Sequence, residues 1–351
     1  MAKLKPVYAF EEANSKNRML LGGKGAGLSE MTRLKLPVPP GFTITTQVCN
    51  QYYDNNRKLE KNVIPEVMKN ITKIEKKTGK KWNSVNNPLL VSVRSGAAIS
   101  MPGMMDTILN LGLNDQTVLG LAKKTDNPRF AWDSYRRFIQ LFGKVVFGVD
   151  DEKFDHVLNT AKKRQGVTDD SKLNLDSLKK IVSEYKKICN NHTKRKFPNN
   201  PNEQLQLAIE AVFKSWMGER AIVYREKNNI TKDIANGTAV NIVTMVFGNM
   251  GDDSGTGVVF TRNGNNGKKE IEGEYLINAQ GEDVVAGVRT GKDISKLKIE
   301  MPKSHRELSN ACSKLEKHFR EPQDIEFTIE KGKFYLLQTR TAKMSAGALV
   351  K

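Results

Sequence analysis

The chain has 351 residues, a formal net charge of +18 and 38% hydrophobic residues. A single core stops growing at about 250 residues, so this length predicts more than one lobe. No apolar run approaches the ~20 residues that cross a bilayer, and the first residues lack the apolar centre of a signal peptide, so the sequence predicts no membrane partner. Cys49, Cys189 and Cys312 lie far apart, without metal-ligand spacing, and a reducing cytoplasm is the expected setting.

The positive charge raises the question of nucleic-acid binding, because clustered lysine and arginine bind phosphate backbones. The basic residues are spread along the whole chain, often beside acids as in Glu75–Lys77, and few aromatic residues lie among them to stack on bases. A solvated surface explains this pattern better, so no nucleic-acid partner is predicted. Part of the positive field remains available for small phosphate-bearing ligands.

Residues 1–113 form the expected first lobe of an α+β protein. Its elements are predicted from apolar runs separated by glycine and proline: a strand at Val7–Phe10, a glycine turn and short helix, a strand at Phe42–Thr46, a charged helical stretch at 51–85, and an apolar β-type segment from Leu89 that ends at Arg94. After Arg94 the sequence becomes a loop of small residues and methionines.

Two features of this lobe could bind phosphate. Gly22–Gly27 is rich in glycine and contains Lys24, and helix N-terminal N–H groups can converge with a lysine on an anion. The segment lacks the Walker spacing, and a tight strand-to-helix connection explains its glycines about as well. Arg94 could be a surface ion-pair partner, but Gly96–Ala98 supply no acid and would expose backbone donors beside its guanidinium.

Residues 114–200 show helical periodicity with few strand signals and are predicted to form a helical insert. Residues 201–246 are predicted to return to the first lobe. They contain an amphipathic helix at Gln204–Arg225 and an apolar, β-branched run at Ala239–Phe247.

The second lobe, residues 247–340, is dominated by strand and turn signals. It opens with the glycine-rich turn Gly248–Gly257, which an ordinary hairpin explains as well as a phosphate loop. Near its end, Asp324–Glu330 alternates strictly between polar and apolar residues. Asp324 and Glu326 therefore face one side of a strand, and three apolar residues face the other.

The partner strand, Phe334–Arg340, places Gln338 and Arg340 on one face, and the loop length decides whether they meet the two acids. A two-residue loop at Lys331–Gly332 would separate the pairs. A three-residue loop at Glu330–Gly332, with glycine in a bulge, would gather all four side chains. We expect the three-residue loop, because two acids, an amide and a guanidinium are costly in a core but suit a platform for Mg²⁺ and phosphate.

Several of these segments resemble the nucleotide-binding region of the pyruvate, phosphate dikinase family. They are the start, LLGGKGAGLSEM with LPVPPGFTITT, the stretch VRSGAAISMPGMMDT around Arg94, and the strands DIEFTIE and LQTR. Phosphoenolpyruvate synthases carry a different, acidic and serine-rich continuation after the arginine, so SMPGMMDT favours the dikinases. The resemblance covers nearly the whole chain and implies an ATP-grasp fold, in which two lobes close on ATP.

The resemblance also implies a role for each matching residue. Phosphate contacts are implied for Lys24, Arg94 and Arg340, a loop pivot for Gly103, adenine recognition by the backbone of Thr244, Met245 and Val246, phosphate or lid contacts for Ser254 and Thr256, and Mg²⁺ and nucleotide binding for Glu282, Asp324, Glu326 and Gln338. Without the resemblance, Thr244–Val246 reads as buried core and Glu282 as an acid in a surface turn.

A complete dikinase is far longer than this chain. In the family, ATP phosphorylates a histidine on a swivelling central domain, within a Gly-x-Thr-[Ser/Cys]-His loop, and that histidine passes phosphate to pyruvate in a barrel domain. None of the four histidines, His156, His192, His305 and His318, lies in such a motif. Residues 341–351 are therefore expected to begin a connector to an absent phosphohistidine domain.

The expected function is the ATP-side half of a pyruvate, phosphate dikinase: a phosphotransferase that uses ATP and phosphate, with Mg²⁺ as cofactor, and leaves AMP and pyrophosphate. Its partners would be the phosphohistidine domain and the pyruvate/phosphoenolpyruvate barrel domain. One alternative is a regulatory module that binds ATP without transfer, which the missing histidine motif supports. Another is an ATP-grasp kinase with a different acceptor, such as a drug or a glucan, which the SMPGMMDT loop disfavours.

Overall fold

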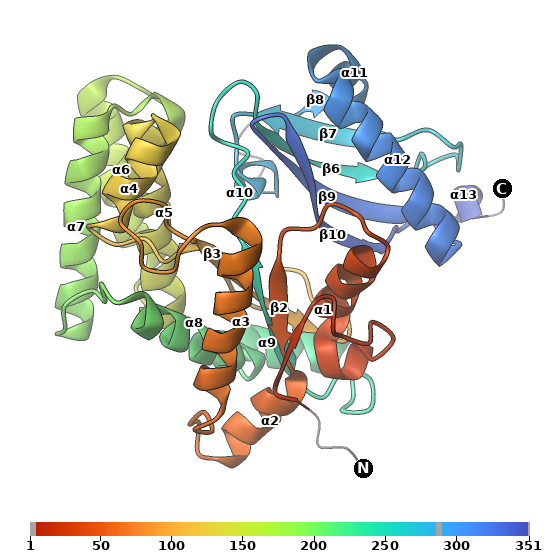
Figure 1. The fold of residues 1–351 in the computed structure, drawn as a ribbon, viewed down its shortest axis with the longest axis horizontal. Coiled ribbons are helices and arrows are strands. Elements are labelled where there is room, and N and C mark those ends of the chain that lie inside the picture. The colour runs from red at the N-terminus through yellow and green to blue at the C-terminus, as the bar shows by residue number, and fades with distance from the viewer. Residues whose placement is uncertain (1–4, 286–289, 350–351) are drawn as a thin grey trace. The chain divides into compact units, whose positions relative to one another are not determined.

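The computed structural model describes residues 5–285 and 290–349 (Figure 1). Within these ranges the chain mixes helices and strands, which confirms the α+β expectation, and its strands form two five-stranded sheets. The chain divides into two compact units. The first contains residues up to 9, 16–25 and 40–245, and the second contains 10–15, 26–39 and the residues from 246 on. The expected first lobe, 1–113, thus differs from the first unit, because two of its short segments pack with the second.

The first unit is built on an antiparallel sheet with strand order β1-β2-β5-β3-β4. The strands are β1 (Val7–Ala9), β2 (Gly41–Ile44), β3 (Val91–Ala97), β4 (Thr107–Leu111) and β5 (Thr238–Thr244). Strand β5 lies between β2 and β3, and all its residues are buried. This central position explains its nearly unbroken run of apolar, β-branched residues, since both of its faces are covered.

Helices cover this sheet and extend beyond it. They are α2 (Thr46–Asp54), α3 (Val63–Thr78), α4 (Thr117–Thr125), α5 (Pro128–Phe147), α6 (Asp151–Gln165), α7 (Leu175–Thr193), α8 (Pro201–Trp216) and α9 (Glu219–Lys227). The stretch expected to be a helical insert supplies α4–α7, which stand together as one block (Figure 1). No helix in the described ranges is long and apolar enough to cross a membrane.

The single helix expected at Gln204–Arg225 is two helices, α8 and α9, separated at Met217–Gly218. Helix α8 packs on β3, β4 and β5 through an apolar stripe that includes Leu205, Ile209 and Val212. Its last turn ends where the Met217 N–H donates back to the Lys214 carbonyl. A helical pattern in sequence does not reveal such a break, because the apolar spacing continues through it.

The second unit holds the other antiparallel sheet, with strand order β10-β9-β6-β7-β8. Its elements are β6 (Gly255–Phe260), β7 (Glu272–Ile277), α10 (Gly281–Val285), β8 (Lys292–Asp293), α11 (Leu297–Glu300), α12 (Pro302–Phe319), β9 (Gln323–Glu330), β10 (Lys333–Thr341) and α13 (Ala346–Leu349). Helix α12 lies along this sheet (Figure 1). The buried, apolar side chains of β9 are Ile325, Phe327 and Ile329, as their alternation predicts.

The hairpin between β9 and β10 has a two-residue turn, so the expected three-residue loop is wrong. Lys333 pairs with Glu330, and the turn residues Lys331 and Gly332 have φ of 48° and 70°. Two successive left-handed residues make the turn whose twist best matches a pair of strands, and this favours the shorter loop. The register then shifts between Leu336 and Gln338, leaving Leu337 as an extra residue in β10.

The apolar segment around Arg94 also differs from expectation, because β3 continues three residues further, to Ala97. Strand β5 offers a partner over this whole length: Ser95, Gly96 and Ala97 pair with Val240, Ala239 and Thr238. The expected loop therefore begins only at Ala98, and Gly96 donates its N–H to the Thr238 hydroxyl at 3.1 Å. Strand β4, within the stretch expected to be loop, was not predicted.

Helix α1 (Arg18–Arg33) contains the glycine-rich segment, and it is not continuous. Gly22 has φ 69° and ψ 164°, a conformation that is essentially restricted to glycine, so the main helix begins after it. Lys24 therefore lies in the first turn of that helix, as the anion-site interpretation requires. Residues up to Gly25 belong to the first unit and those from Ala26 to the second.

Candidate functional site

A row of polar side chains crosses one face of the first sheet. Strand pairing places Thr43 opposite Asn241, and Asn241 opposite Arg94, so the three share a face. The Thr43 hydroxyl donates to Asn241 Oδ1 at 2.8 Å. The Asn241 amide nitrogen and the Arg94 Nε are buried and have no hydrogen-bond partner. Two buried donors without acceptors are unfavourable unless a ligand or water completes them.

The start of α1 packs directly against this row, and glycines make that approach possible. A Cβ on Gly22 would lie 1.9 Å from the Gly96 carbonyl oxygen, and one on Gly25 would lie 2.8 Å from Asn241 Oδ1. A Cβ on Gly96 would lie 3.3 Å from Lys24 Cβ. The glycines are thus required for packing, and this packing brings Lys24 to the face that carries Arg94.

These groups are all donors or cations: a lysine, a guanidinium, an amide N–H and the first N–H groups of a helix. Such a set suits an anion, because each group gains most from a negative partner and the helix dipole adds to them. Gly103 lies further along, between β3 and β4, with φ 71° and no heavy atom within 4 Å of an added Cβ. Its left-handed conformation and open surroundings are compatible with a pivot.

The resemblance implies that the backbone of Thr244–Val246 recognises adenine. Two N–H groups of this segment already make hydrogen bonds within the protein. The N–H of Thr244 donates to the Pro40 carbonyl at 2.9 Å, and the N–H of Met245 donates to the Leu90 carbonyl at 2.9 Å. A base could therefore use the carbonyl groups of this segment or the peptide group of Val246. Val246 is the first residue of the segment that belongs to the second unit.

The second unit brings the four predicted hairpin residues together. The extra residue at Leu337 reverses the face parity of β10, so Gln338 pairs with Glu326 and Arg340 with Asp324. Arg340 Nε lies 2.6 Å from Asp324 Oδ2, and Gln338 Nε2 donates to Glu326 Oε1 at 3.1 Å. We call these four residues the carboxylate platform. The expected grouping is present, although the bulge rather than the loop produces it.

One carboxylate oxygen of the carboxylate platform has no partner within the protein. Asp324 Oδ1 is buried and has no hydrogen-bond partner, although the other oxygen of the same carboxylate is held by Arg340. Mg²⁺ in nucleotide sites is commonly bound by one or two protein carboxylates together with the phosphates. No group of three or more His, Cys, Asp or Glu side chains gathers as a metal site within the described ranges. Asp324 and Glu326 therefore fit a metal that the nucleotide would help to hold.

The remaining predicted residues of this unit lie in different settings. Ser254 and Thr256 are both buried, at 0% and 3% exposure. The Ser254 hydroxyl accepts the Lys331 N–H at 3.0 Å, and the Thr256 hydroxyl donates to the Phe327 carbonyl at 3.0 Å. A nucleotide contact by either hydroxyl would have to replace or share these bonds. Glu282 lies in α10, and its side chain is outside the described part of the structure.

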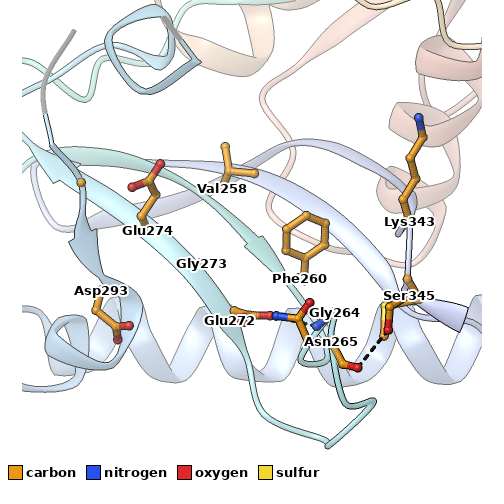
Figure 2. A pocket seen from close by; sticks show the side chains of 12 residues that line it. Val258, Phe260, Gly264, Asn265, Glu272, Gly273, Glu274, Asp293, Lys343 and Ser345 are labelled. Atoms are coloured by element: carbon orange, nitrogen blue, oxygen red, sulfur yellow. Dashed lines mark hydrogen bonds between the residues drawn. The ribbon is translucent and has the colours of Figure 1, made fainter. Parts of the chain in front are cut away.

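A groove of about 820 Å³ opens on the same sheet face as the carboxylate platform. Register places the groove residues Val258 and Phe260 opposite Glu326 and Asp324. Figure 2 shows Glu274 and Asp293 on one side of the groove and Lys343 on the other. Because acids dominate this groove, the anionic phosphates of a nucleotide are expected near Arg340 rather than inside it.

Sequence reasoning did not select Asn241, although a signal was present. It is a polar residue inside the apolar run 239–247, and the strand that holds it is buried throughout. A buried amide in a central strand requires a partner on its face of the sheet, and that partner lies on a distant segment of the chain, at Thr43. The pairing of β5 with β2 could not be read from the sequence alone.

Comparison with known proteins adds an independent finding. The family model described as "Pyruvate phosphate dikinase, AMP/ATP-binding domain" matches residues 18–64, 55–304 and 292–350. Pyruvate, phosphate dikinase of Entamoeba histolytica is 54% identical over 347 residues, which cover 98% of this chain and 39% of that protein. The dikinase of Clostridium symbiosum is 53% identical over 343 residues, covering 97% and 39%.

A plant relative gives the same result. The chloroplastic pyruvate, phosphate dikinase 1 of Arabidopsis thaliana is 49% identical over 351 residues, which cover 99% of this chain and 36% of that protein. The chain therefore spans about two fifths of the length of these relatives. The similarity extends along almost the whole chain, through both units.

Proposed function

Because this chain belongs to the family of the pyruvate phosphate dikinase AMP/ATP-binding domain, we propose that it binds Mg-ATP and transfers phosphate from it to a histidine on a separate domain or chain. The proposal includes an ATP-grasp architecture for the two units. The observation that carries it is the carboxylate platform, in which a buried, unpaired oxygen of Asp324 lies beside Glu326, Gln338 and Arg340. Together with the family match, this donor set favours a metal–nucleotide site over a structural ion pair.

In the first unit, Lys24 and Arg94 stabilise negative charge on the ATP phosphates, and Asn241 adds a neutral donor beside them. The support is the shared face of these side chains and the unsatisfied Arg94 Nε and Asn241 Nδ2. Charge-assisted hydrogen bonds are about twice as strong as neutral ones, so the two cations contribute most. Gly103 lets the following loop adjust over the phosphates, and Thr244–Val246 offers backbone groups to the base.

In the second unit, Asp324 and Glu326 hold Mg²⁺, with Gln338 fixing Glu326 and Arg340 approaching the phosphates. When bound, the metal neutralises part of the negative charge that develops during phosphoryl transfer. Arg340 is 42% exposed while its partner Asp324 is 9% exposed, so its guanidinium can contact a ligand without leaving the acid. Glu282, Ser254 and Thr256 remain proposed nucleotide or metal contacts on the strength of the resemblance.

The wider reaction is also a proposal. The relatives are named for a dikinase reaction, and this chain matches about two fifths of them. We infer that the chain performs the ATP and phosphate half, leaving AMP and pyrophosphate, and that a phosphohistidine domain and a pyruvate/phosphoenolpyruvate barrel domain complete it. A cytoplasmic setting is proposed as well, on the basis of the three scattered cysteines, although some relatives are described as chloroplastic.

Glu326→Gln tests the platform, because it keeps the shape of the side chain and removes the charge that would hold the metal. We expect Mg²⁺-dependent ATP binding, measured by titration calorimetry, to weaken about tenfold or more, whereas binding without Mg²⁺ changes little. Glu321→Gln is the matched control, since Glu321 precedes β9 and accepts a hydrogen bond from the Thr341 hydroxyl outside the carboxylate platform. Equal binding by wild type and Glu326→Gln would overturn the metal assignment.

Transfer is tested separately by mixing the chain with ATP, phosphate and a histidine domain supplied as a second polypeptide. The proposal predicts AMP and phosphohistidine in the complete mixture and neither product when the histidine domain is left out. Binding of ATP with no AMP in the complete mixture would instead identify a module that binds nucleotide without transferring phosphate.

A further inference from the structure

Gln280 is a buried residue whose amide group has no partner. The residue is 4% exposed, and both its side-chain nitrogen and its side-chain oxygen are buried without a hydrogen bond. It lies between strand β7 and helix α10, and its own N–H donates to Asp283 Oδ2 at 2.9 Å. Its carbonyl accepts the Asp283 N–H at 3.0 Å, so the main chain is satisfied and the amide group alone is not.

The other buried glutamines in the described ranges show how this side chain is normally accommodated. Gln204 accepts the Gly112 N–H at 3.1 Å and donates to the carbonyls of Leu113 and Pro198 at 3.0 and 2.8 Å. Gln323 accepts the Thr339 hydroxyl at 2.8 Å and donates to a backbone carbonyl. A buried amide with neither donor nor acceptor engaged is unfavourable, which points to a missing partner rather than to packing.

A second unpaired polar atom and an apolar cluster lie on the segments next to Gln280. The preceding residue, Ala279, donates its N–H to the Gly248 carbonyl at 2.9 Å, so the segment that starts at Val246 runs beside it. The next residue on that segment, Asn249, has a buried Oδ1 that also lacks a partner. Leu276, Ala279 and Val284 form an apolar cluster close by, against which Val258 packs.

A glutamine amide offers an acceptor and a donor side by side, in one plane. Adenine presents the complement, because its 6-amino group donates and the adjacent ring nitrogen accepts, and glutamine pairs with adenine in this way in protein–DNA complexes. The apolar cluster can cover the face of a base, and Asn249 Oδ1 offers a second acceptor for the amino group. A ribose hydroxyl could also hydrogen-bond to the Gln280 amide, but ribose carries no amino group that would use a second acceptor at Asn249 Oδ1.

We propose that Gln280 recognises the adenine base of the bound nucleotide through paired hydrogen bonds, and thereby makes the site selective for a 6-amino purine. This inference rests on the proposed ATP-binding function and deepens it. All of the groups that carry it, namely Val246, Gly248, Asn249 and Gln280, belong to the second unit.

The test compares ATP with purine riboside triphosphate, which lacks the 6-amino group, on wild type and on Gln280→Met. Wild type is expected to bind ATP about tenfold or more tightly than the analogue. The variant is expected to bind ATP about tenfold or more weakly than wild type does, and the analogue within about threefold of the wild-type value. Both are measured by titration calorimetry with Mg²⁺.

Stability separates this role from a structural one. Gln280→Met removes an unsatisfied amide, so the thermal midpoint of the ligand-free protein is expected to stay or rise. The matched control is Gln204→Met, which leaves the Gly112 N–H and the Leu113 and Pro198 carbonyls without their hydrogen-bond partner. Its midpoint is expected to fall, with no change in the ratio of the two nucleotide affinities.

Each remaining outcome decides the question. If both nucleotides weaken equally in Gln280→Met, the amide contacts ribose or supports the fold, and the adenine assignment is wrong. If wild type binds both nucleotides equally, the assignment also fails, whether or not the variant folds, while the proposed ATP function stands. If wild type binds neither nucleotide, the proposed function fails together with the inference.

Discussion

The Arg94 Nε is buried on a strand without a hydrogen-bond partner, and this sets it apart from arginines that support the fold. Arg129, for comparison, donates to the carbonyls of Leu173 and Asp170 at 2.9 and 2.8 Å and so ties helix α5 to the segment before α7. An arginine donor that is not used internally remains available to a ligand. The two residues can therefore be distinguished by what their removal changes.

Arg94→Met is expected to weaken ATP binding roughly tenfold to a hundredfold, because hydrogen bonds to charged groups contribute about 1.5–3 kcal/mol. Its free energy of unfolding should change by less than about 1 kcal/mol, since methionine fills the stem volume and Nε leaves no partner behind. Arg129→Met should do the reverse and lower stability while ATP affinity is kept. Calorimetric titration and urea unfolding of both variants make the comparison, and a parallel loss in both would contradict the phosphate role of Arg94.

The ionisation of Glu30 is expected to make the stability of the second unit depend on pH in the acidic range. Hydrogen bonding from Arg33, helped by Ser15 and His318 and opposed by burial, lowers the pKa of the Glu30 carboxyl from 4.5 to about 2. Because the pKa is depressed in the folded state, the ionised carboxylate stabilises the fold above pH 4.5 and loses that effect as the pH falls toward 2.

Glu30→Gln should therefore have a lower urea midpoint than wild type at pH 7, and the gap between them should close as the pH falls below 4.5. Glu66→Gln is the control, because Glu66 and Lys69 form an exposed pair at 3.4 Å that contributes little. A gap that stays constant from pH 7 to pH 3 would show that the ionisation of Glu30 is not what stabilises the fold.

At the scale of elements, the start of α1 and strand β3 depend on one close approach. Gly22 combines a conformation that favours glycine with a position 1.9 Å from the Gly96 carbonyl oxygen for any added Cβ. Lys24 follows two residues later, so the backbone contact determines where its side chain begins. The contact that packs these two elements together therefore also positions Lys24.

Gly22→Ala is expected to destabilise the first unit by roughly 3 kcal/mol or more, from backbone strain and the forced separation of α1 and β3. Gly79→Ala gives the cost of alanine at an ordinary left-handed position with open surroundings, because Gly79 has φ 68° and ψ 0° and no heavy atom within 4 Å of an added Cβ. Its cost should be only about 1 kcal/mol. Urea unfolding of both variants measures the difference, and equal costs would mean that the close approach is unimportant.

The same scale shows what the sequence could and could not predict. Alternation in 324–330 correctly separated Asp324 and Glu326 from the buried Ile325, Phe327 and Ile329, because side-chain period is a local property. The grouping with Gln338 and Arg340 was predicted for a wrong reason. An extra residue inside a strand leaves no clear sequence signal, whereas a glycine in a turn does, so the parity change was assigned to the turn.

Other features depended on partners far away in sequence. Strand β3 runs past Arg94 because Thr238–Val240 continue the ladder, and Asn241 is selected only when Thr43 and Arg94 are known to flank it. Gln280 was not selected from the sequence, since its burial and its unsatisfied amide appear only in the fold. The α+β class and the helical stretch, by contrast, follow from periodicity within single segments.

At the scale of the whole molecule, the reactivity of the three cysteines can be used to follow unfolding. Burial raises the pKa of each thiol, Cys49, Cys189 and Cys312, to about 12. The first two lie in the first unit and the third in the second. Because only the thiolate reacts, each native cysteine should be modified by iodoacetamide at pH 8 roughly a hundredfold or more slowly than an exposed thiol.

Labelling through a urea series, with each site quantified by mass spectrometry, is then expected to give one transition for Cys49 and Cys189 together. Cys312 reports the second unit and can differ. Coincident transitions at all three sites would show that the two units unfold as one cooperative block. Rapid labelling of any of the three without urea would contradict the burial on which this prediction depends.

Helix α1 contributes residues to both units, and this limits how the chain can be cut into fragments. The chain passes between the units several times before residue 40 and once more near residue 246. A single cut after Met245 would therefore leave residues 10–15 and 26–39 in the N-terminal fragment, although they pack in the second unit. Nicked protein should migrate as one species until denatured, and the C-terminal fragment expressed alone would lack part of the second unit. The N-terminal glycine-rich helix thus belongs to both folding units, and its first turn also packs beside the sheet face that carries Arg94.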